Sequence, residues 1–69
     1  MEKTGDNIRG GREVLFELTR IGNAVKVTAV DAATGIEASI VGAPAMGEEM
    51  LKRNALRKLD YVLKRRGAG

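Results

Sequence analysis

The chain has 69 residues, of which 43% are hydrophobic, and a formal net charge of +3. This length allows one domain near the lower size limit for a self-sufficient core, and this composition excludes a disordered chain. The absence of cysteine and histidine excludes disulfide bonds and the usual ligands of zinc. The apolar runs are too short to span a membrane, and residues 1–12 lack the apolar region of a secretory signal. We therefore expect a cytoplasmic protein without a membrane partner.

Residues 1–11 contain three glycines and alternating charges, and Ile8 is their only large apolar residue. This composition predicts a flexible N-terminal leader. A single domain is expected at residues 12–67, followed by a short tail at residues 68–69.

Three strands are predicted after the leader, at residues 13–21, 24–30 and 36–41, because apolar and polar residues alternate along each of them. The dipeptide Gly22-Asn23 and the segment 31–35, which begins with Asp and ends with Gly, are typical of tight turns. Short turns join adjacent antiparallel strands, so the sequence predicts a three-stranded meander.

Residues 47–66 are predicted to form one long amphipathic helix, since neither Gly nor Pro interrupts residues 48–66. Its apolar side comprises Leu51, Ala55, Leu56, Leu59, Val62 and Leu63. This side is expected to pack against the strand residues Val14, Phe16, Leu18, Val25, Val27, Ala29, Ile36, Ala38 and Ile40. The predicted fold is α+β: a three-stranded antiparallel β-meander covered on one face by a single long C-terminal helix.

Positive charge is concentrated in this helix. Residues 1–46 carry five basic and six acidic side chains (net −1), whereas residues 47–69 carry seven basic and three acidic ones (net +4). Basic side chains on one helix side, with an aromatic ring to stack on a base, are typical of nucleic-acid contacts. The candidate contacts are Arg53, Arg57, Lys58, Tyr61, Lys64 and Arg65. The alternative is a solvated face that keeps the protein soluble.

Four large apolar residues fall on the face of the predicted sheet that points away from the helix: Leu15, Ile21, Val30 and Val41. A contiguous exposed group of this kind indicates a protein interface. Scattered surface residues without a function are the alternative interpretation.

Catalytic side chains are scarce. Without His and Cys the chain lacks the commonest general base and the thiol nucleophile. Asp31 is explained as a turn residue, and the glycine-rich segments lack the spacing of phosphate-binding loops. We expect no enzymatic activity, no cofactor and no bound metal.

The segments REVLFEL (12–18), IGNAVKVTAVD (21–31), TG (34–35), SIVG (39–42) and ALRKLDYVL (55–63) resemble a small uncharacterised bacterial protein family. The resemblance implies a β-β-β-α fold and no established activity. In architecture alone, the chain is also similar to the C-terminal part of double-stranded-RNA-binding domains. That family places a lysine cluster at the start of its last helix, where this sequence has Glu48 and Glu49.

Two functional hypotheses follow. The first is a non-catalytic protein-interaction domain, which includes a homodimer formed through the outer sheet face or an edge strand. The second is an accessory RNA- or DNA-binding domain that uses the basic helix face. The first is favoured because the start of the helix is acidic and the basic face contains one aromatic residue.

Overall fold

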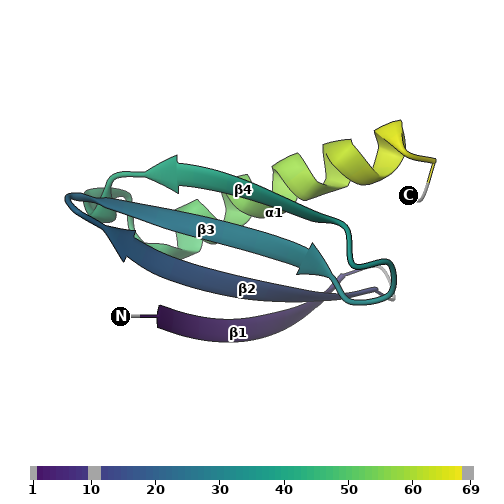
Figure 1. Cartoon of the computed structure of the whole chain (residues 1–69), viewed down its shortest axis with the longest axis horizontal. Helices are drawn as coiled ribbons and strands as arrows, with labels where there is room; N and C mark the ends of the chain where they lie inside the picture. The colour runs from purple at the N-terminus through teal and green to yellow at the C-terminus, as the bar shows by residue number, and fades with distance from the viewer. Residues whose placement is uncertain (1, 10–11, 68–69) are drawn as a thin grey trace.

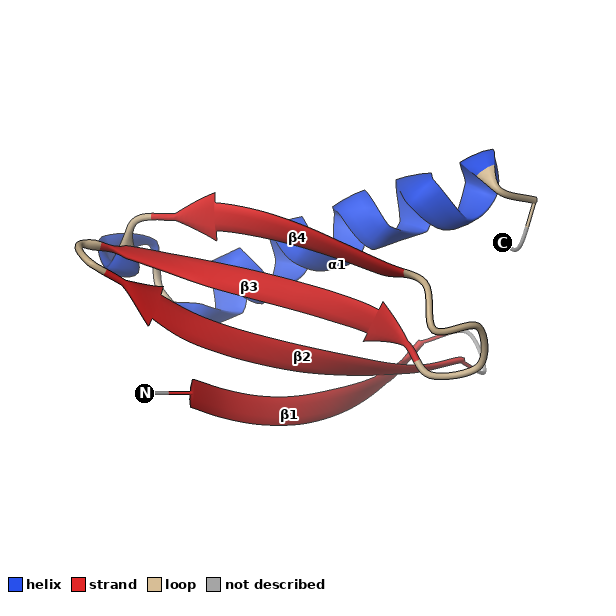
Figure 2. Ribbon diagram, in the orientation of Figure 1, coloured by secondary structure: helices blue, strands red, loops and turns tan. Residues whose placement is uncertain are grey.

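A computed structural model describes residues 2–9 and 12–67. The elements in chain order are β1 (Glu2–Arg9), β2 (Arg12–Ile21), β3 (Ala24–Asp31), β4 (Glu37–Gly42), a short 3₁₀ helix η1 (Pro44–Met46) and α1 (Glu48–Arg65). The strands form one antiparallel sheet in the order β1-β2-β3-β4. Figures 1 and 2 show α1 lying against one face of this sheet, behind β3 and β4.

The predicted β-meander and C-terminal helix are confirmed. The three expected strands are β2, β3 and β4, and each expected boundary lies within one residue of the observed one. The helix begins at Glu48 and ends at Arg65, with acidic residues in its first turn and basic residues in its last turn. This distribution of charge opposes the helix dipole at both ends and therefore stabilises the helix.

The prediction of a flexible leader is wrong for residues 2–9, which form β1. This strand pairs antiparallel with β2 from Glu2↔Thr19 to Arg9↔Arg12. Strand pairing depends on backbone N–H and C=O groups, so a segment without apolar alternation can still add to an available sheet edge. The expectations for residues 1, 10–11 and 68–69 lie outside the described residues.

Both predicted turns are present. Ile21 and Ala24 pair on either side of Gly22-Asn23, and Gly22 has a φ of +58°. A positive φ at the first central residue alone is the pattern of a type II′ turn, which favours Gly there. In the second turn, Asp31 is buried, and its Oδ2 accepts hydrogen bonds from the backbone N–H and the hydroxyl of Thr34, at 3.1 and 2.7 Å.

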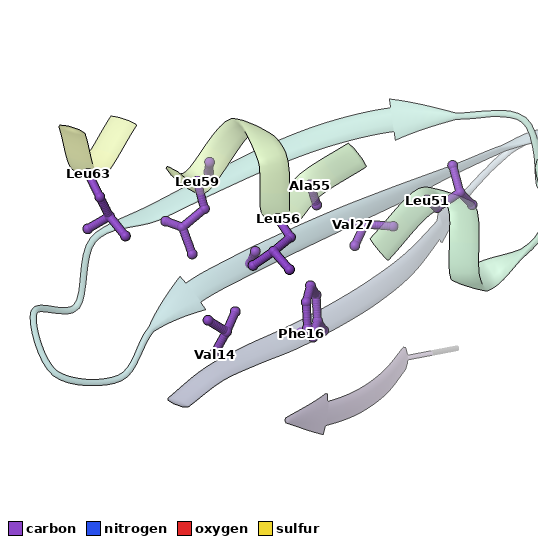
Figure 3. Close-up of a cluster of buried hydrophobic side chains, with 10 residues drawn as sticks. Val14, Phe16, Val27, Leu51, Ala55, Leu56, Leu59 and Leu63 are labelled. Carbon is purple, nitrogen blue, oxygen red and sulfur yellow. The ribbon is translucent and has the colours of Figure 1, made fainter. Parts of the chain in front are cut away.

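The hydrophobic core lies between α1 and the sheet and contains every residue that the sequence predicted for it. The buried members are Val14, Phe16, Val27, Ala29, Ala38, Leu51, Ala55, Leu56, Leu59 and Leu63, and the half-buried members are Leu18, Val25, Ile36, Ile40 and Val62. In Figure 3 the helix side chains point toward Val14, Phe16 and Val27 on the strands. One sheet face is therefore covered by α1, and the opposite face is left for contact with solvent or a partner.

Candidate interaction surfaces

The outer face of the sheet, opposite α1, carries one cross-strand pair of large apolar residues. Leu15 on β2 is in direct register with Val30 on β3. Leu15 is 36% exposed and Val30 is half-buried. Directly opposed apolar side chains on one sheet face contact each other, so these two residues form a small apolar surface, which lies toward the end of the sheet where β3 ends and β4 begins.

The other two apolar residues predicted for this face are separated from that pair. Val41 pairs with Lys26, and Ile21 pairs with Ala24. Between these positions and Leu15–Val30 lies a polar row in which Thr28 and Ser39 share a hydrogen bond of 2.7 Å between their hydroxyl oxygens. Ile21 and Val41 are 51% and 64% exposed. The strand register therefore divides the four residues into one cross-strand pair and two separate positions.

Acidic residues surround the Leu15–Val30 pair. Glu37 on β4 is opposite Val30, and Glu13 and Glu17 occupy the positions on β2 that flank Leu15 on the same face. Among the positions of β2, β3 and β4 on this face, one is basic, namely Lys26. Within β2, β3 and β4, the apolar pair thus shares this face with three carboxylates and one lysine.

The six residues predicted to contact nucleic acid are all exposed on α1. Arg53, Arg57 and Lys64 lie on the side of α1 opposite the core, at intervals of four and seven residues. These intervals correspond to about one and two helical turns, so the three side chains form a row along the helix. The row spans about 16 Å at 1.5 Å per residue.

The remaining three predicted contacts bind within the domain. The guanidinium of Arg65 lies 5.8 Å from the centroid of the Tyr61 ring, and its Nη1 donates a hydrogen bond of 3.3 Å to the Tyr61 hydroxyl. Lys58 Nζ donates a hydrogen bond of 2.8 Å to the backbone oxygen of Ser39 on β4. The Lys58 bond depends on the position of β4, so sequence spacing does not reveal it. Tyr61 and Arg65 are four residues apart on α1, a spacing at which helix side chains meet.

Metal-binding side chains and membrane-spanning helices were both sought among the described residues. No three His, Cys, Asp or Glu side chains of residues 2–9 and 12–67 lie close enough together to hold a metal ion. Within the same residues, no helix is both long and apolar enough to cross a bilayer.

Comparison with known proteins identifies the family. Residues 11–66 match the family described as "Domain of unknown function (DUF6898)". This segment contains β2, β3, β4, α1 and every core residue, and β1 precedes it. Searches of curated proteins and of solved structures gave no match. The match extends over most of the chain, which therefore belongs to the DUF6898 family of domains of unknown function.

Proposed function

We propose that the chain is a non-catalytic protein-interaction domain whose contact surface is centred on Leu15 and Val30. The supporting observation is the direct register of these two apolar residues on the sheet face that α1 does not cover. Removal of apolar surface from water contributes about 25 cal/mol of binding free energy per Å². A partner that covers Leu15 and Val30 together therefore gains more binding free energy than one that covers Ile21 or Val41 alone.

The charge around this surface favours a basic partner over a second copy of the chain. In a symmetric dimer through this face, Glu37 of one copy would approach Glu37 of the other copy. Like charges at an interface are unfavourable, whereas a lysine or arginine beside the apolar residues of a partner complements Glu37. The partner is therefore expected to present one or two apolar side chains among basic residues.

The test compares Leu15→Glu with Val41→Glu, which adds the same charge at an isolated apolar position of the same face. Proteins captured from cells by the wild-type chain should be lost with Leu15→Glu and retained with Val41→Glu. Circular dichroism establishes that both variants are folded. Identical capture by both variants would contradict the proposal. If sedimentation detects a dimer of the wild type that Leu15→Glu abolishes, the partner of this surface is a second copy of the chain and not a basic protein.

A second candidate function is supported by a different observation, the exposed row of Arg53, Arg57 and Lys64 on α1. Three cations on one side of a helix are placed to neutralise phosphates of RNA or DNA, and such binding weakens steeply with salt. The test measures the binding of a labelled RNA and a labelled DNA oligonucleotide at several salt concentrations. Arg57→Glu combined with Lys64→Glu should reduce affinity, whereas Lys26→Glu on the sheet should not. Absence of binding by the wild type at low salt would exclude this function.

A further inference from the structure

We infer that the edge of β2 is an acceptor site for an extended segment of a partner polypeptide, and that β1 is the chain's own occupant of this site. The site uses the backbone of β2 on the side of β1, so it is separate from the outer-face surface of Leu15 and Val30.

The direction of the β2 backbone follows from its pairing with β3. Ile21 and Ala24 pair across a two-residue turn and therefore exchange backbone hydrogen bonds, and the carbonyl of Glu13 accepts a bond of 3.0 Å from Ala32 N–H. Successive backbone groups of an antiparallel strand point to opposite sides. The N–H and C=O groups of Val14, Phe16 and Leu18 therefore point toward β1. An extended peptide can complete such a row of donors and acceptors by adding a strand.

β1 is an addition to a domain that is otherwise complete. The family match begins at residue 11, after β1, and all core residues lie on β2 and later elements or in the segment before β4. Figure 1 shows β1 at the edge of the sheet, on the side remote from β4. Its sequence, EKTGDNIR, contains Gly, Asp and Asn, which are unfavourable in strands. A segment with a higher strand propensity would therefore compete with β1 for the edge.

The register specifies the side chains that such a segment should carry. Val14, Phe16 and Leu18 belong to the core and pair with Asn7, Gly5 and Lys3 of β1. These β1 positions lie on the same sheet face as the core, because directly paired residues share a face. Apolar residues at alternate positions of the incoming segment would extend the core there, whereas β1 offers polar residues and glycine.

The opposite edge of the sheet, on β4, has one of its outward carbonyls covered by a side chain of α1. The backbone N–H and C=O groups of Ala38 and Ile40 point toward β3, so those of Ser39 point outward. Lys58 Nζ donates a hydrogen bond of 2.8 Å to the backbone oxygen of Ser39. A lysine at an edge strand is a common protection against strand addition. Lys58 therefore protects part of the β4 edge, whereas the described residues show no comparable lysine contact with the backbone of β2.

The test uses the full chain and a proline that disrupts β1. Asn7→Pro removes an N–H directed at β2, because Asn7 pairs with Val14, whereas Asp6→Pro removes one directed away from β2. The probe is a labelled peptide with the sequence of residues 1–9 carrying Lys3→Val and Asn7→Val. We expect Asn7→Pro to bind the probe at least about tenfold more tightly than Asp6→Pro does, because the competing strand is weakened.

Hydrogen exchange reports the location of binding. The amides of Val14, Phe16 and Leu18 should exchange faster in Asn7→Pro and should be protected again by the probe. Equal affinity of the two proline variants, or binding without protection of these amides, would overturn the inference.

A disulfide lock tests the same inference if Asn7→Pro does not fold. The chain has no cysteine, and Thr4 pairs with Glu17 at a position where no backbone bonds are exchanged. Oxidised Thr4→Cys/Glu17→Cys should not bind the probe, and reduction should restore binding. The control pair Lys26→Cys/Val41→Cys joins β3 to β4 and should bind in both states. Binding to the oxidised lock would overturn the proposal. If the single variants Thr4→Cys and Glu17→Cys are mixed and form disulfide-linked dimers, β1 of one chain lies beside β2 of another. That result would identify a second copy of the chain as the occupant.

Discussion

Gly42 at the end of β4 lies directly against Leu51 in the first turns of α1. A Cβ placed on Gly42 would be 2.5 Å from Leu51 Cδ2 and 3.3 Å from the sulfur of Met46. Leu51 is buried in the core, so it cannot move away without disturbing the packing of α1. The absence of a side chain at residue 42 therefore permits the close approach of helix and sheet.

Gly42→Ala should lower the free energy of unfolding by about 1–3 kcal/mol, because the added methyl group overpacks this junction. Denaturant unfolding followed by circular dichroism measures the loss. In the double variant Gly42→Ala/Leu51→Val, the shortened side chain makes room, so the combined loss should be smaller than the sum of the two single losses. Strict additivity would contradict the steric explanation.

Gly22→Ala should cost about 1–2 kcal/mol, since Gly22 has a φ of +58° and an alanine is strained in that conformation. No atom lies within 4 Å of the position that a Cβ would occupy, so the cost is one of backbone conformation and not of packing. Asn23→Ala is the control, because no described residue other than glycine has a positive φ. Equal thermal stability of Gly22→Ala and the wild type would contradict this assignment of the turn.

Asp31→Ala should lower the free energy of unfolding by about 2–3 kcal/mol, because it removes a buried acceptor of hydrogen bonds from Thr34. Asp31→Asn keeps a side-chain oxygen and should cost less. Thr34→Val removes the hydroxyl bond to Asp31 and the bond of 3.2 Å that this hydroxyl accepts from Ile36 N–H, but it keeps the backbone bond to Asp31, and it should cost about 1 kcal/mol. Urea unfolding of the three variants gives the order, and a larger loss for Thr34→Val than for Asp31→Ala would refute it.

Lys58→Ala should change stability little, because its bond to Ser39 is exposed, but it should increase self-association. The variant removes the side chain that covers the outward carbonyl of Ser39 on β4. Lys64→Ala removes an equal charge from an exposed helix position that has no bond to the sheet and is the matched control. Light scattering during prolonged incubation distinguishes the two variants. Equal rates of aggregation would show that Lys58 does not protect the edge.

The prediction of the core was correct in each residue because hydrophobic periodicity is a local property. Val25 and Val27 alternate with polar neighbours, and Leu51, Ala55 and Leu59 recur at the helical interval. Each pattern identifies its own apolar side without knowledge of the partner element. Turns were predictable for the same reason, since Gly22 and Asp31 act on backbone groups close to them in sequence.

β1 was not predictable by this reasoning. Its segment contains one large apolar residue, Ile8, and its pairing with β2 is made by backbone groups that every sequence possesses. Whether such a segment pairs depends on an available strand edge beside it, which here is provided by β2.

The candidate surfaces show the same division between local pattern and assembled structure. Sequence periodicity was sufficient to place Leu15 and Val30 on the outer face of the sheet, and Arg57 and Lys64 on the polar side of the helix. Only the strand register decided that Leu15 contacts Val30 while Ile21 and Val41 stand apart, and only the packing of α1 on β4 directed Lys58 to Ser39. The local sequence pattern determines which face of a strand or helix a side chain lies on. Its neighbours on that face come from other strands, and their alignment is set only in the completed fold.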